Sequence, residues 1–396
     1  MRLRAASVVA TVVAVTAGTW VAPASSTAST VVGTSYARAT PSRCPSVDGP
    51  KCHVQLRTGI RMAYEEVGPQ HGRAVILLHG LTDSSRSWSR AMQALHARKP
   101  GWHVLAVDQR GQGDSSMPQG TRCRNNPVIC FRPVDLANDV VAFMDAKHIR
   151  RAAVAGHSMG SLVAQEVALR HPRRVSKAIL IASSNTGLDN PTLAGFVLPQ
   201  IEKWRQQLAA KGISWPAGAY DKTPLDADPA GALAYMRDGW DVDPVAPQSF
   251  VDAVAAETAR VKLGTWLGET EGLLRVDNTK RLRHLEVPTL VLWGTQDAIF
   301  YAKDQQGLIA ALTRAAKGRG SFWWKAYGTR PLPSSGYQVD EIGHNVQWEA
   351  PDGVARDIAS FVRTGRPTRD LFRTNAPGNV KQIVTVPGAA RLIHRR

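Results

Sequence analysis

Short apolar runs alternate with longer amphipathic stretches along most of the chain. The apolar runs predict strands at residues 52–57, 61–66, 74–79, 103–108, 152–157, 176–182 and 289–293, with a last strand at either 323–327 or 337–342. The amphipathic stretches predict helices at residues 87–97, 133–147, 159–171, 303–317 and 353–363. This alternation is typical of an α/β protein, so we expect a doubly wound, mostly parallel sheet of eight strands with helices on both faces.

Two of the predicted strands contain continuous apolar runs. Residues 74–78 read Ala-Val-Ile-Leu-Leu, and residues 290–292 read Leu-Val-Leu. A strand in a parallel sheet is covered on both faces, which favours continuous apolar runs over alternating ones. The two runs therefore support a parallel sheet.

The region from residue 184 to residue 286 breaks this rhythm. It has no strand signal, but helical patterns occur at residues 198–211, 229–239 and 247–261, and prolines mark the turns between them. We expect a helical insertion here, with the N-terminal part of the α/β core at residues 44–183 and its C-terminal part at residues 287–364.

The first residues resemble a targeting segment. Arg2 and Arg4 precede a light apolar run, and Ala22-Pro23-Ala24 supplies a small-x-small cleavage site. We expect a signal peptide over residues 1–24, a flexible leader over residues 25–43 and a secreted protein. An uncleaved membrane anchor is the alternative, although the run is short and weakly apolar for a spanning helix.

The four cysteines agree with export. Cys44 and Cys52 are eight residues apart, and Cys123 and Cys130 are seven apart. In an oxidising compartment they should form disulfides, and among the three possible pairings proximity favours 44–52 with 123–130. A metal site would need closer spacing and nearby histidines, so we expect no metal.

The chain has a formal net charge of +17. Much of the excess is scattered, and the basic C-terminal tail, residues 365–396, adds seven Lys and Arg against one Asp. A basic surface could contact an anionic cell envelope, whereas the simpler interpretation is a solvated, soluble surface. No nucleic-acid motif accompanies the charge, so no nucleic-acid partner is expected.

The strongest chemical signal is Gly156-His157-Ser158-Met159-Gly160. An apolar strand precedes it and a helix follows, so Ser158 should occupy a strained turn between them, where the two glycines leave room for the backbone. Such a turn exposes the hydroxyl of Ser158 and directs amides at the start of the helix toward developing negative charge. Ser158 is therefore the candidate nucleophile.

Two further motifs accompany the serine. The third strand ends in His79-Gly80-Leu81, and the fourth is followed by Asp108-Gln109-Arg110-Gly111-Gln112-Gly113-Asp114-Ser115. With these motifs the chain resembles the α/β-hydrolase superfamily, in its serine esterase, lipase and peptidase branch, from about residue 54 to residue 362 except over the helical insertion. The resemblance implies that Asp108 and Arg110 brace loops near the site. His79 could be read as catalytic, but a structural role through hydrogen bonds to the loop backbone is the preferred interpretation.

The resemblance also implies the partners of Ser158. The backbone amides of Leu81 and Met159 would form the oxyanion hole, and the family's order is serine, then acid, then histidine. The turn Gly294-Thr295-Gln296-Asp297 after a buried strand matches the family's acid turn, which makes Asp297 the preferred acid. Asp304 and Asp189 are weaker candidates, and a helix-capping role is the alternative for Asp297.

His344 is the preferred base, because Gly343-His344 matches the family's turn before the last helix. His284 precedes the acid strand and His394 lies in the tail, so both fit poorly. Asp297 and His344 are 47 positions apart, which is longer than usual for the family. The extra length should lie in residues 320–337, whose aromatic residues either cover the site or pack against the last helix.

These residues predict an acyl-transfer enzyme without a cofactor, whose substrate is a small-molecule ester or peptide. Epoxide hydrolases and haloalkane dehalogenases resemble the flanking motifs but carry Asp at the nucleophile position. We expect the insertion to cap the pocket and to favour hydrophobic or lipid esters. The apolar residues that should fill the cap or line its pocket are Trp204, Trp215, Trp240, Trp266, Leu198, Leu263, Leu267 and Leu273.

Three alternatives stay open. A secreted aminopeptidase of the proline iminopeptidase kind uses a similar scaffold, and it would need cap acids to hold a free amine. A cofactor-free perhydrolase or C–C hydrolase would use the same triad, and a non-catalytic binding module would use none of it. The oligomeric state is not indicated. The acids available in the cap are Glu202, Glu257, Glu269 and Glu271.

Overall fold

A mixed sheet of nine strands forms the centre of the computed structural model, which describes residue 44, residues 49–243, 245–328 and 342–368, and three two-residue strands beyond them. All the described elements belong to one compact unit within residues 39–396. The predicted signal peptide and leader, residues 1–43, lie outside the described residues, as does most of the basic tail. No helix within the described part of the chain is long and apolar enough to cross a membrane.

The order of the strands confirms the predicted sheet. From one edge to the other the strands are β1 (Cys52–Gln55), β2 (Arg61–Val67), β4 (Trp102–Val107), β3 (Arg73–Leu78), β5 (Ala152–His157), β6 (Val175–Ile181), β7 (Thr289–Gly294), β8 (Phe322–Tyr327) and β11 (Val384–Thr385). The central strands β4, β3, β5, β6, β7 and β8 run parallel, while β1, β2 and β11 pair antiparallel at the edges. The eighth strand takes the first of its two predicted positions, and β11 was not predicted. A separate pair, β9 (Phe372–Arg373) with β10 (Val380–Lys381), is antiparallel.

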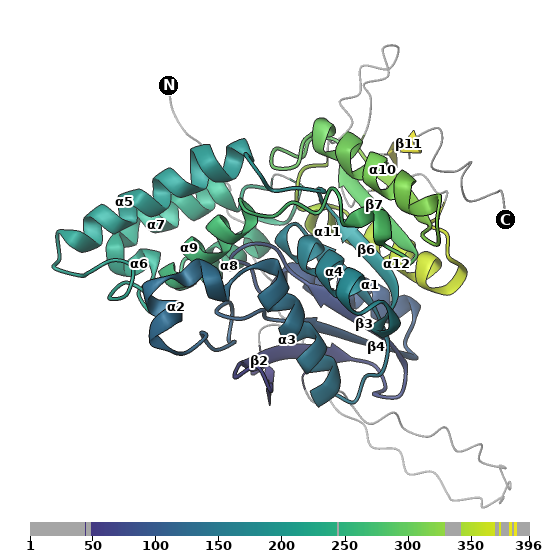
Figure 1. Cartoon of the computed structure of the whole chain (residues 1–396), viewed down its shortest axis with the longest axis horizontal. Coiled ribbons are helices and arrows are strands. Elements are labelled where there is room, and N and C mark those ends of the chain that lie inside the picture. Colours follow the sequence, from purple (N-terminus) through teal and green to yellow (C-terminus); the bar gives the residue numbers. More distant parts are fainter. Residues whose placement is uncertain are drawn as a thin grey trace, which may run out of the picture. The chain divides into compact units, whose positions relative to one another are not determined.

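Helices cover both faces of this sheet (Figure 1). Strand β3 shows why, since Val75 and Leu77 face one apolar layer whereas Ile76 and Leu78 face the other. The first layer is closed by α1 (Ser89–Arg98), α11 (Val346–Glu349) and α12 (Pro351–Thr364), and the second by α3 (Pro133–Ala146), α4 (Met159–Arg170) and α10 (Ala302–Ala316). Short helical turns connect these elements: η1 (Ser85–Trp88), α2 (Thr121–Asn125), η2 (Pro127–Cys130), η3 (Pro172–Arg174) and η6 (Leu282–His284).

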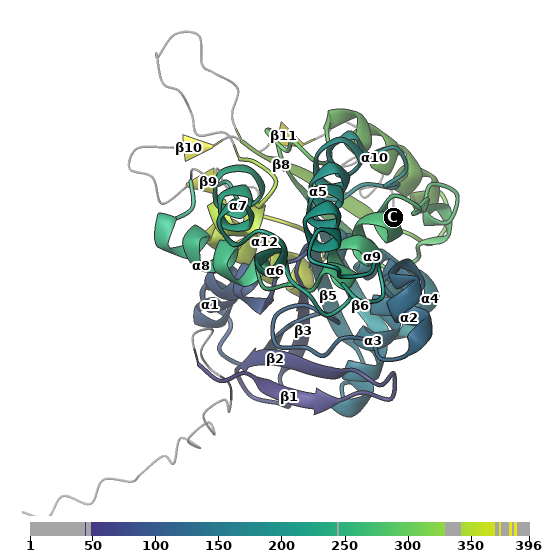
Figure 2. The ribbon, with the colours of Figure 1, turned by 90° about the vertical axis from the view of Figure 1, so that its left-hand side faces the viewer.

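The chain between β6 and β7 is helical. It contains η4 (Leu193–Val197), α5 (Leu198–Ala209), α6 (Pro224–Ala227), α7 (Pro229–Tyr235), η5 (Met236–Trp240), α8 (Gln248–Thr258) and α9 (Leu263–Leu273), and we call this segment the cap. Figure 1 shows the cap helices gathered on one side of the sheet, and in Figure 2 they stand in front of it. Trp204 and Trp266 are fully buried in the cap with ring centroids 5.3 Å apart, so they form its own core.

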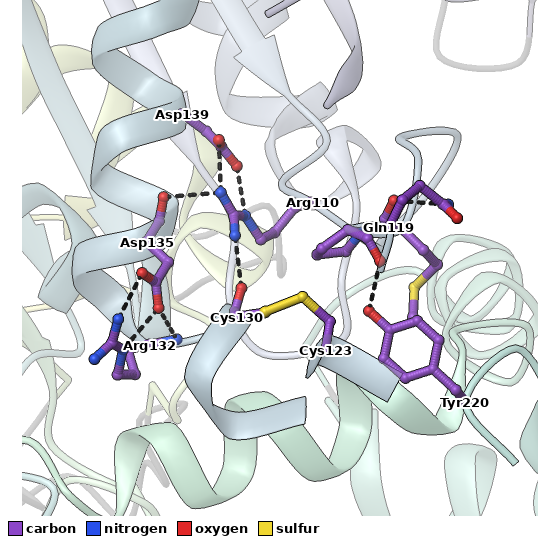
Figure 3. The surroundings of a disulfide bond; sticks show 10 residues. Arg110, Gln119, Cys123, Cys130, Arg132, Asp135, Asp139 and Tyr220 are labelled. Carbon is purple, nitrogen blue, oxygen red and sulfur yellow. Dashed lines mark hydrogen bonds and ion pairs between the residues drawn. A yellow bond between two sulfur atoms is a disulfide. The ribbon is translucent and has the colours of Figure 1, made fainter. Parts of the chain in front are cut away.

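Both disulfides predicted from proximity are present, Cys44–Cys52 and Cys123–Cys130. Figure 3 shows that Arg110 lies beside the second one. Its guanidinium donates to the carbonyl of Cys130 at 2.6 Å and forms a two-pronged ion pair with Asp139 of α3 at 2.6 and 2.7 Å. Because a buried bidentate pair is geometrically specific, Arg110 ties the loop after β4 to the disulfide-closed loop and to α3.

Candidate active site

Ser158 occupies the tight turn between β5 and α4, at the carboxyl end of a central strand. Its backbone has φ 52° and ψ −121°, a conformation that costs a non-glycine residue about 1–3 kcal/mol. The flanking glycines are required by space. A Cβ atom on Gly156 would lie 2.0 Å from the carbonyl oxygen of Gly160, and one on Gly160 would lie 2.4 Å from that of His79. The turn therefore holds the serine in a strained conformation that only small neighbours permit.

Asp297 and His344 meet beyond the ends of β7 and β8. Nδ1 of His344 lies 2.8 Å from Oδ1 of Asp297, and the same oxygen accepts the amides of Ile299 and Phe300 at 2.9 Å each. A carboxylate can only accept, so Nδ1 carries the proton and Nε2 is the basic nitrogen. Nε2 has no hydrogen-bond partner within the described residues, and His344 lines the same cavity as Ser158.

The weaker candidates for acid and base have other positions. The carboxylate of Asp304 accepts the amide of Tyr301 at 2.8 Å and so caps α10. Asp189 is exposed, and His284 accepts a hydrogen bond from its neighbour Arg283 in η6. His394 lies outside the described residues.

Strand β8 accounts for part of the long spacing between Asp297 and His344. Residues 322–327 are strand β8, so the aromatic residues at its start do not form a loop over the site. Trp323 belongs to the apolar layer that contains α12, and its indole donates to the carbonyl of Gly365 at 3.0 Å. Packing against the last helix is therefore the correct interpretation for Trp323. Residues 329–341, the remainder of the spacer, lie outside the described residues.

Two backbone amides are available beside the serine. Met159 is the first residue of α4, where an amide has no intrahelical acceptor, and Leu81 lines the cavity. Neither amide takes part in a hydrogen bond within the described residues. His79 has the structural place expected for it, since its Nδ1 lies 2.9 Å from the carbonyl of Gly80 and its Nε2 accepts the amide of Gln109 at 2.9 Å.

The cap holds the loop after Leu81 in place. The indole of Trp240 donates to the hydroxyl of Thr82 at 3.2 Å, and the hydroxyl of Ser84 donates to Glu257 of α8 at 2.6 Å. Thr82 has a positive φ of 60°, which is unusual for this residue type. The loop is thus kept in a strained conformation by contacts from the cap.

His157 was not singled out in the sequence, although it is the second residue of the Gly156–Gly160 pattern. Its Nε2 lies 3.0 Å from the backbone carbonyl of His344, which can only accept, so this nitrogen carries the proton. Burial, followed by the neighbouring His344, lowers the pKa of His157 well below its ordinary value. A neutral His157 therefore holds the backbone of His344 beside the serine.

Ser158 and His344 line a cavity of about 590 Å³ between the core and the cap. Four carboxyl groups line it, from Asp83, Asp241, Asp243 and Glu349, together with the aromatic rings of Phe196, Trp240 and Trp348. Of the cap tryptophans named from the sequence, only Trp240 reaches this lining within the described residues.

The acids that the sequence suggested for the cap do not line the cavity. Glu202 pairs with an arginine of its own helix, and Glu271 pairs with an arginine just after the end of α9. Glu257 accepts a hydrogen bond from Ser84, and Glu269 accepts one from Gln112. A helical pattern does not reveal which face of a cap helix lines the pocket, so the sequence could only name these glutamates as available. Within the described residues, no three His, Cys, Asp or Glu side chains lie close enough together to hold a metal ion.

Burial raises the pKa values of three carboxyl groups that line the cavity. It raises the pKa of Asp83 to about 7, against hydrogen bonds from Ser87 and the Gly80 amide. It also raises the pKa of Asp243 to about 7. The pKa of Asp241 lies well above its ordinary value because of burial and, next, because of the neighbouring Asp83. These three carboxyl groups share a poorly solvated space beside the candidate base.

A family model described as the alpha/beta hydrolase fold matches residues 73–351, which include Ser158, Asp297 and His344. The chain belongs to this family. The resemblance inferred from the motifs is thereby confirmed, and the hydrolase's sheet has the strand order that the fold requires.

Several curated proteins are similar in sequence to this hydrolase. A non-heme chloroperoxidase of Streptomyces lividans is 28% identical over 260 residues, 62% of this chain and 82% of the relative. Epoxide hydrolase B of Mycobacterium tuberculosis is 25% identical over 359 residues, 78% of this chain and 97% of the relative. Rat bifunctional epoxide hydrolase 2 is 33% identical over 162 residues, 41% of this chain, but the match spans only 27% of that longer protein.

Solved structures support the fold. An esterase from Exiguobacterium antarcticum superposes with a TM-score of 0.57 at 16% identity, over 80% of this chain and all of that one. The epoxide hydrolase VrEH1 from Vigna radiata gives a TM-score of 0.56 at 17% identity, over 79% of this chain and 97% of that one. At these identities the likeness concerns the fold alone.

Proposed function

We propose that this hydrolase cleaves carboxylic esters through an acyl-enzyme on Ser158. The observation that carries the proposal is the hydrogen bond of 2.8 Å between His344 and Asp297, which leaves the basic Nε2 of His344 in the cavity that Ser158 lines. A serine needs such an oriented base, because its hydroxyl is a weak nucleophile at neutral pH.

In the proposed reaction Nε2 of His344 takes the proton of the Ser158 hydroxyl as its oxygen attacks the substrate carbonyl. The amides of Leu81 and Met159 donate to the oxyanion, and each such donor is typically worth about 3 kcal/mol. The protonated His344 then gives its proton to the leaving alcohol, and Asp297 stabilises the imidazolium meanwhile. Water, deprotonated by His344, finally releases the acid and frees Ser158.

The identity of the nucleophile favours esters over epoxides. Epoxide hydrolase B of Mycobacterium tuberculosis is similar over 78% of this chain, but the family pattern for epoxide opening has an Asp where this chain has Ser158. A carboxylate can open an epoxide to an alkyl ester that water then cleaves at the carbonyl. A serine would form an ether, which no water can release in this way, so acyl transfer suits Ser158.

An aminopeptidase is the second candidate, and one observation favours it. Four carboxyl groups line the cavity, as a site for a free amine would need, although they are Asp83, Asp241, Asp243 and Glu349 rather than the glutamates named from the sequence. We also propose that the protein is secreted. The apolar N-terminal run and the two disulfides support this, since disulfides persist mainly in oxidising compartments.

The test uses the purified full chain with a fluorophosphonate probe and three substrate sets: p-nitrophenyl esters, aminoacyl arylamides and phenyl oxirane. We expect labelling and ester hydrolysis that are both lost in Ser158→Ala and kept in Ser176→Ala, a serine of β6 outside the cavity lining. Labelling that survives in Ser158→Ala would refute the nucleophile. Cleavage of arylamides alone would favour the aminopeptidase, and turnover of the oxirane alone would overturn acyl transfer.

A further inference from the structure

We infer that the cavity beside Ser158 binds the positively charged amine of the substrate, so that the preferred substrates carry an ammonium group close to the scissile carbonyl. The inference rests on the proposed acyl transfer and specifies its substrate class. It adds a cationic group to the hydrophobic ester expected from the sequence.

The first observation is where the acids lie. Asp83 follows the Gly80-Leu81 turn, and both its Oδ2 atom and the Cβ atom of Ser158 lie next to Gly80, each 3.3 Å from the position that a Cβ there would occupy. Asp241 and Asp243 come from the cap, directly after η5. The core and the cap therefore bring carboxyl groups to the same cavity as the nucleophile, and Asp83 and Asp241 are close enough to raise one another's energy when charged.

The second observation is an unsatisfied acceptor. Asp241 is only 3% exposed, yet its Oδ2 atom has no hydrogen-bond partner within the described residues. A buried acceptor without a partner is costly, so native structures contain few of them, and each one calls for an explanation such as a missing ligand. Among the described residues that line the cavity there is no Lys or Arg to neutralise the acids. A ligand with a cationic hydrogen-bond donor would give this oxygen a partner and would also balance the negative charge of the acids.

Aromatic rings complete a site for an alkylated ammonium group. Phe196 and Trp240 line the cavity from the cap, and Trp348 lines it from α11. The indole N–H of Trp240 donates to the hydroxyl of Thr82, and this hydrogen bond fixes the orientation of the ring. Trp240 directly precedes Asp241 in the sequence. Aromatic faces attract cations, most strongly where water is excluded, and they also accept the methyl groups of a quaternary amine.

The surrounding charges agree with this assignment. Burial raises the pKa values of Asp83 and Asp243 to about 7, and burial also raises the pKa of Asp241 well above its ordinary value. Smaller effects lower these pKa values: Ser87, the Gly80 amide and His344 act on Asp83, two backbone amides and Arg90 act on Asp243, and Thr258 acts on Asp241. Because an isolated buried carboxylate is unfavourable, a cation that enters the cavity gains by stabilising its charged form.

The test compares two esters that differ in one charge. p-Nitrophenyl 4-(trimethylammonio)butanoate and p-nitrophenyl 5,5-dimethylhexanoate have the same shape, with nitrogen in one and carbon in the other. For the wild-type chain we expect kcat/KM for the cationic ester to be at least about tenfold higher, as expected for a desolvated cation among carboxylates and rings. Tetramethylammonium chloride should compete with the neutral ester, whereas equal NaCl should not.

The variants identify the site. Asp241→Asn and Asp243→Asn should each lower the ratio of kcat/KM for the cationic ester to kcat/KM for the neutral ester by about threefold or more. The matched control is Asp238→Asn, an exposed acid of η5 outside the cavity lining, which should leave the preference unchanged. If Asp241→Asn does not fold, Asp243→Asn and the tetramethylammonium competition with the wild-type chain decide the matter.

Two outcomes would overturn the inference: equal kcat/KM for the two esters, or a cationic preference that neither Asp variant changes. Failure of the proposed function has a different signature. In that case Ser158→Ala would still hydrolyse the neutral ester, or the wild-type chain would hydrolyse neither ester. Hydrolysis of the neutral ester that depends on Ser158, without a cationic preference, would refute only the substrate class.

Discussion

The hydrogen bond between Asp297 and His344 permits a quantitative prediction. In Asp297→Asn the side-chain oxygen can still accept the amides of Ile299 and Phe300 and the proton on Nδ1 of His344, because all three donors converge on the same oxygen, Oδ1. The orientation and tautomer of His344 are therefore expected to persist. The substitution removes the negative charge beside the imidazolium of His344, which forms in the proposed reaction as Ser158 attacks.

The size of the effect follows from the geometry. Nδ1 and Oδ1 are 2.8 Å apart, and charge delocalised over the two groups is centred farther apart than these atoms. Two unit charges about 4 Å apart attract by about 4 kcal/mol at an effective dielectric constant of about 20. Because about 1.4 kcal/mol corresponds to a factor of ten in rate, kcat should fall by about a thousandfold.

The assay measures kcat for a p-nitrophenyl ester and the rate of fluorophosphonate labelling. The control is Asp304→Asn, whose carboxylate caps α10, and this variant should stay within about threefold of wild type. Oδ2 of Asp297 has no partner within the described residues, so the new amide costs about 1–3 kcal/mol of stability, and unfolding is measured separately. A folded Asp297→Asn with a nearly wild-type kcat would refute the assigned acid.

Three further predictions concern stability. Gly160→Ala places a Cβ atom 2.4 Å from the carbonyl of His79, so urea unfolding should show a loss of about 1–3 kcal/mol, and an unchanged midpoint would contradict the geometry of the tight turn at Ser158. Burial lowers the pKa of His79 from 6.5 to about 4, so the unfolded chain binds more protons than the folded chain between these pH values. The free energy of unfolding should therefore fall by about 3 kcal/mol as the pH drops from 6.5 toward 4. His79→Gln should reduce this dependence of the unfolding free energy on pH. Lys51→Met leaves the buried Asp108 without its ion pair at 2.8 Å and should cost about 3 kcal/mol in urea, whereas adding Asp108→Asn should recover part of the loss.

Much of the fold could be predicted from local pattern. Strands such as β3, β5 and β7 were predicted to within a residue or two, because continuous apolar runs between turn residues carry the signal within the segment itself. Short elements were missed because a segment of a few residues carries little signal of its own. Helix α2 has five residues and α11 has four, which is too few to show a helical period, and β11 exists only by pairing with β8.

The candidate site divides in the same way. Ser158 and Gly160 could be recognised from one short motif, since the turn that needs them is local. The chain order of acid and histidine pointed to Asp297 and His344, which the structure brings within hydrogen-bonding distance. The role of His157 could have been suspected from its place in the motif, but its contact with the carbonyl of His344 joins residues 187 positions apart.

Sequence alone therefore pointed to the residues of the proposed triad and oxyanion hole, because these residues lie in turns at the ends of strands whose apolar patterns are local. Only the tertiary structure decided the character of the pocket. The sequence pointed to apolar and glutamate-bearing cap helices, whereas the cavity combines apolar and aromatic residues with Asp83, Asp241 and Asp243. The physical reason is that burial and the loss of solvation depend on which faces of separate segments meet, and no single segment encodes that meeting.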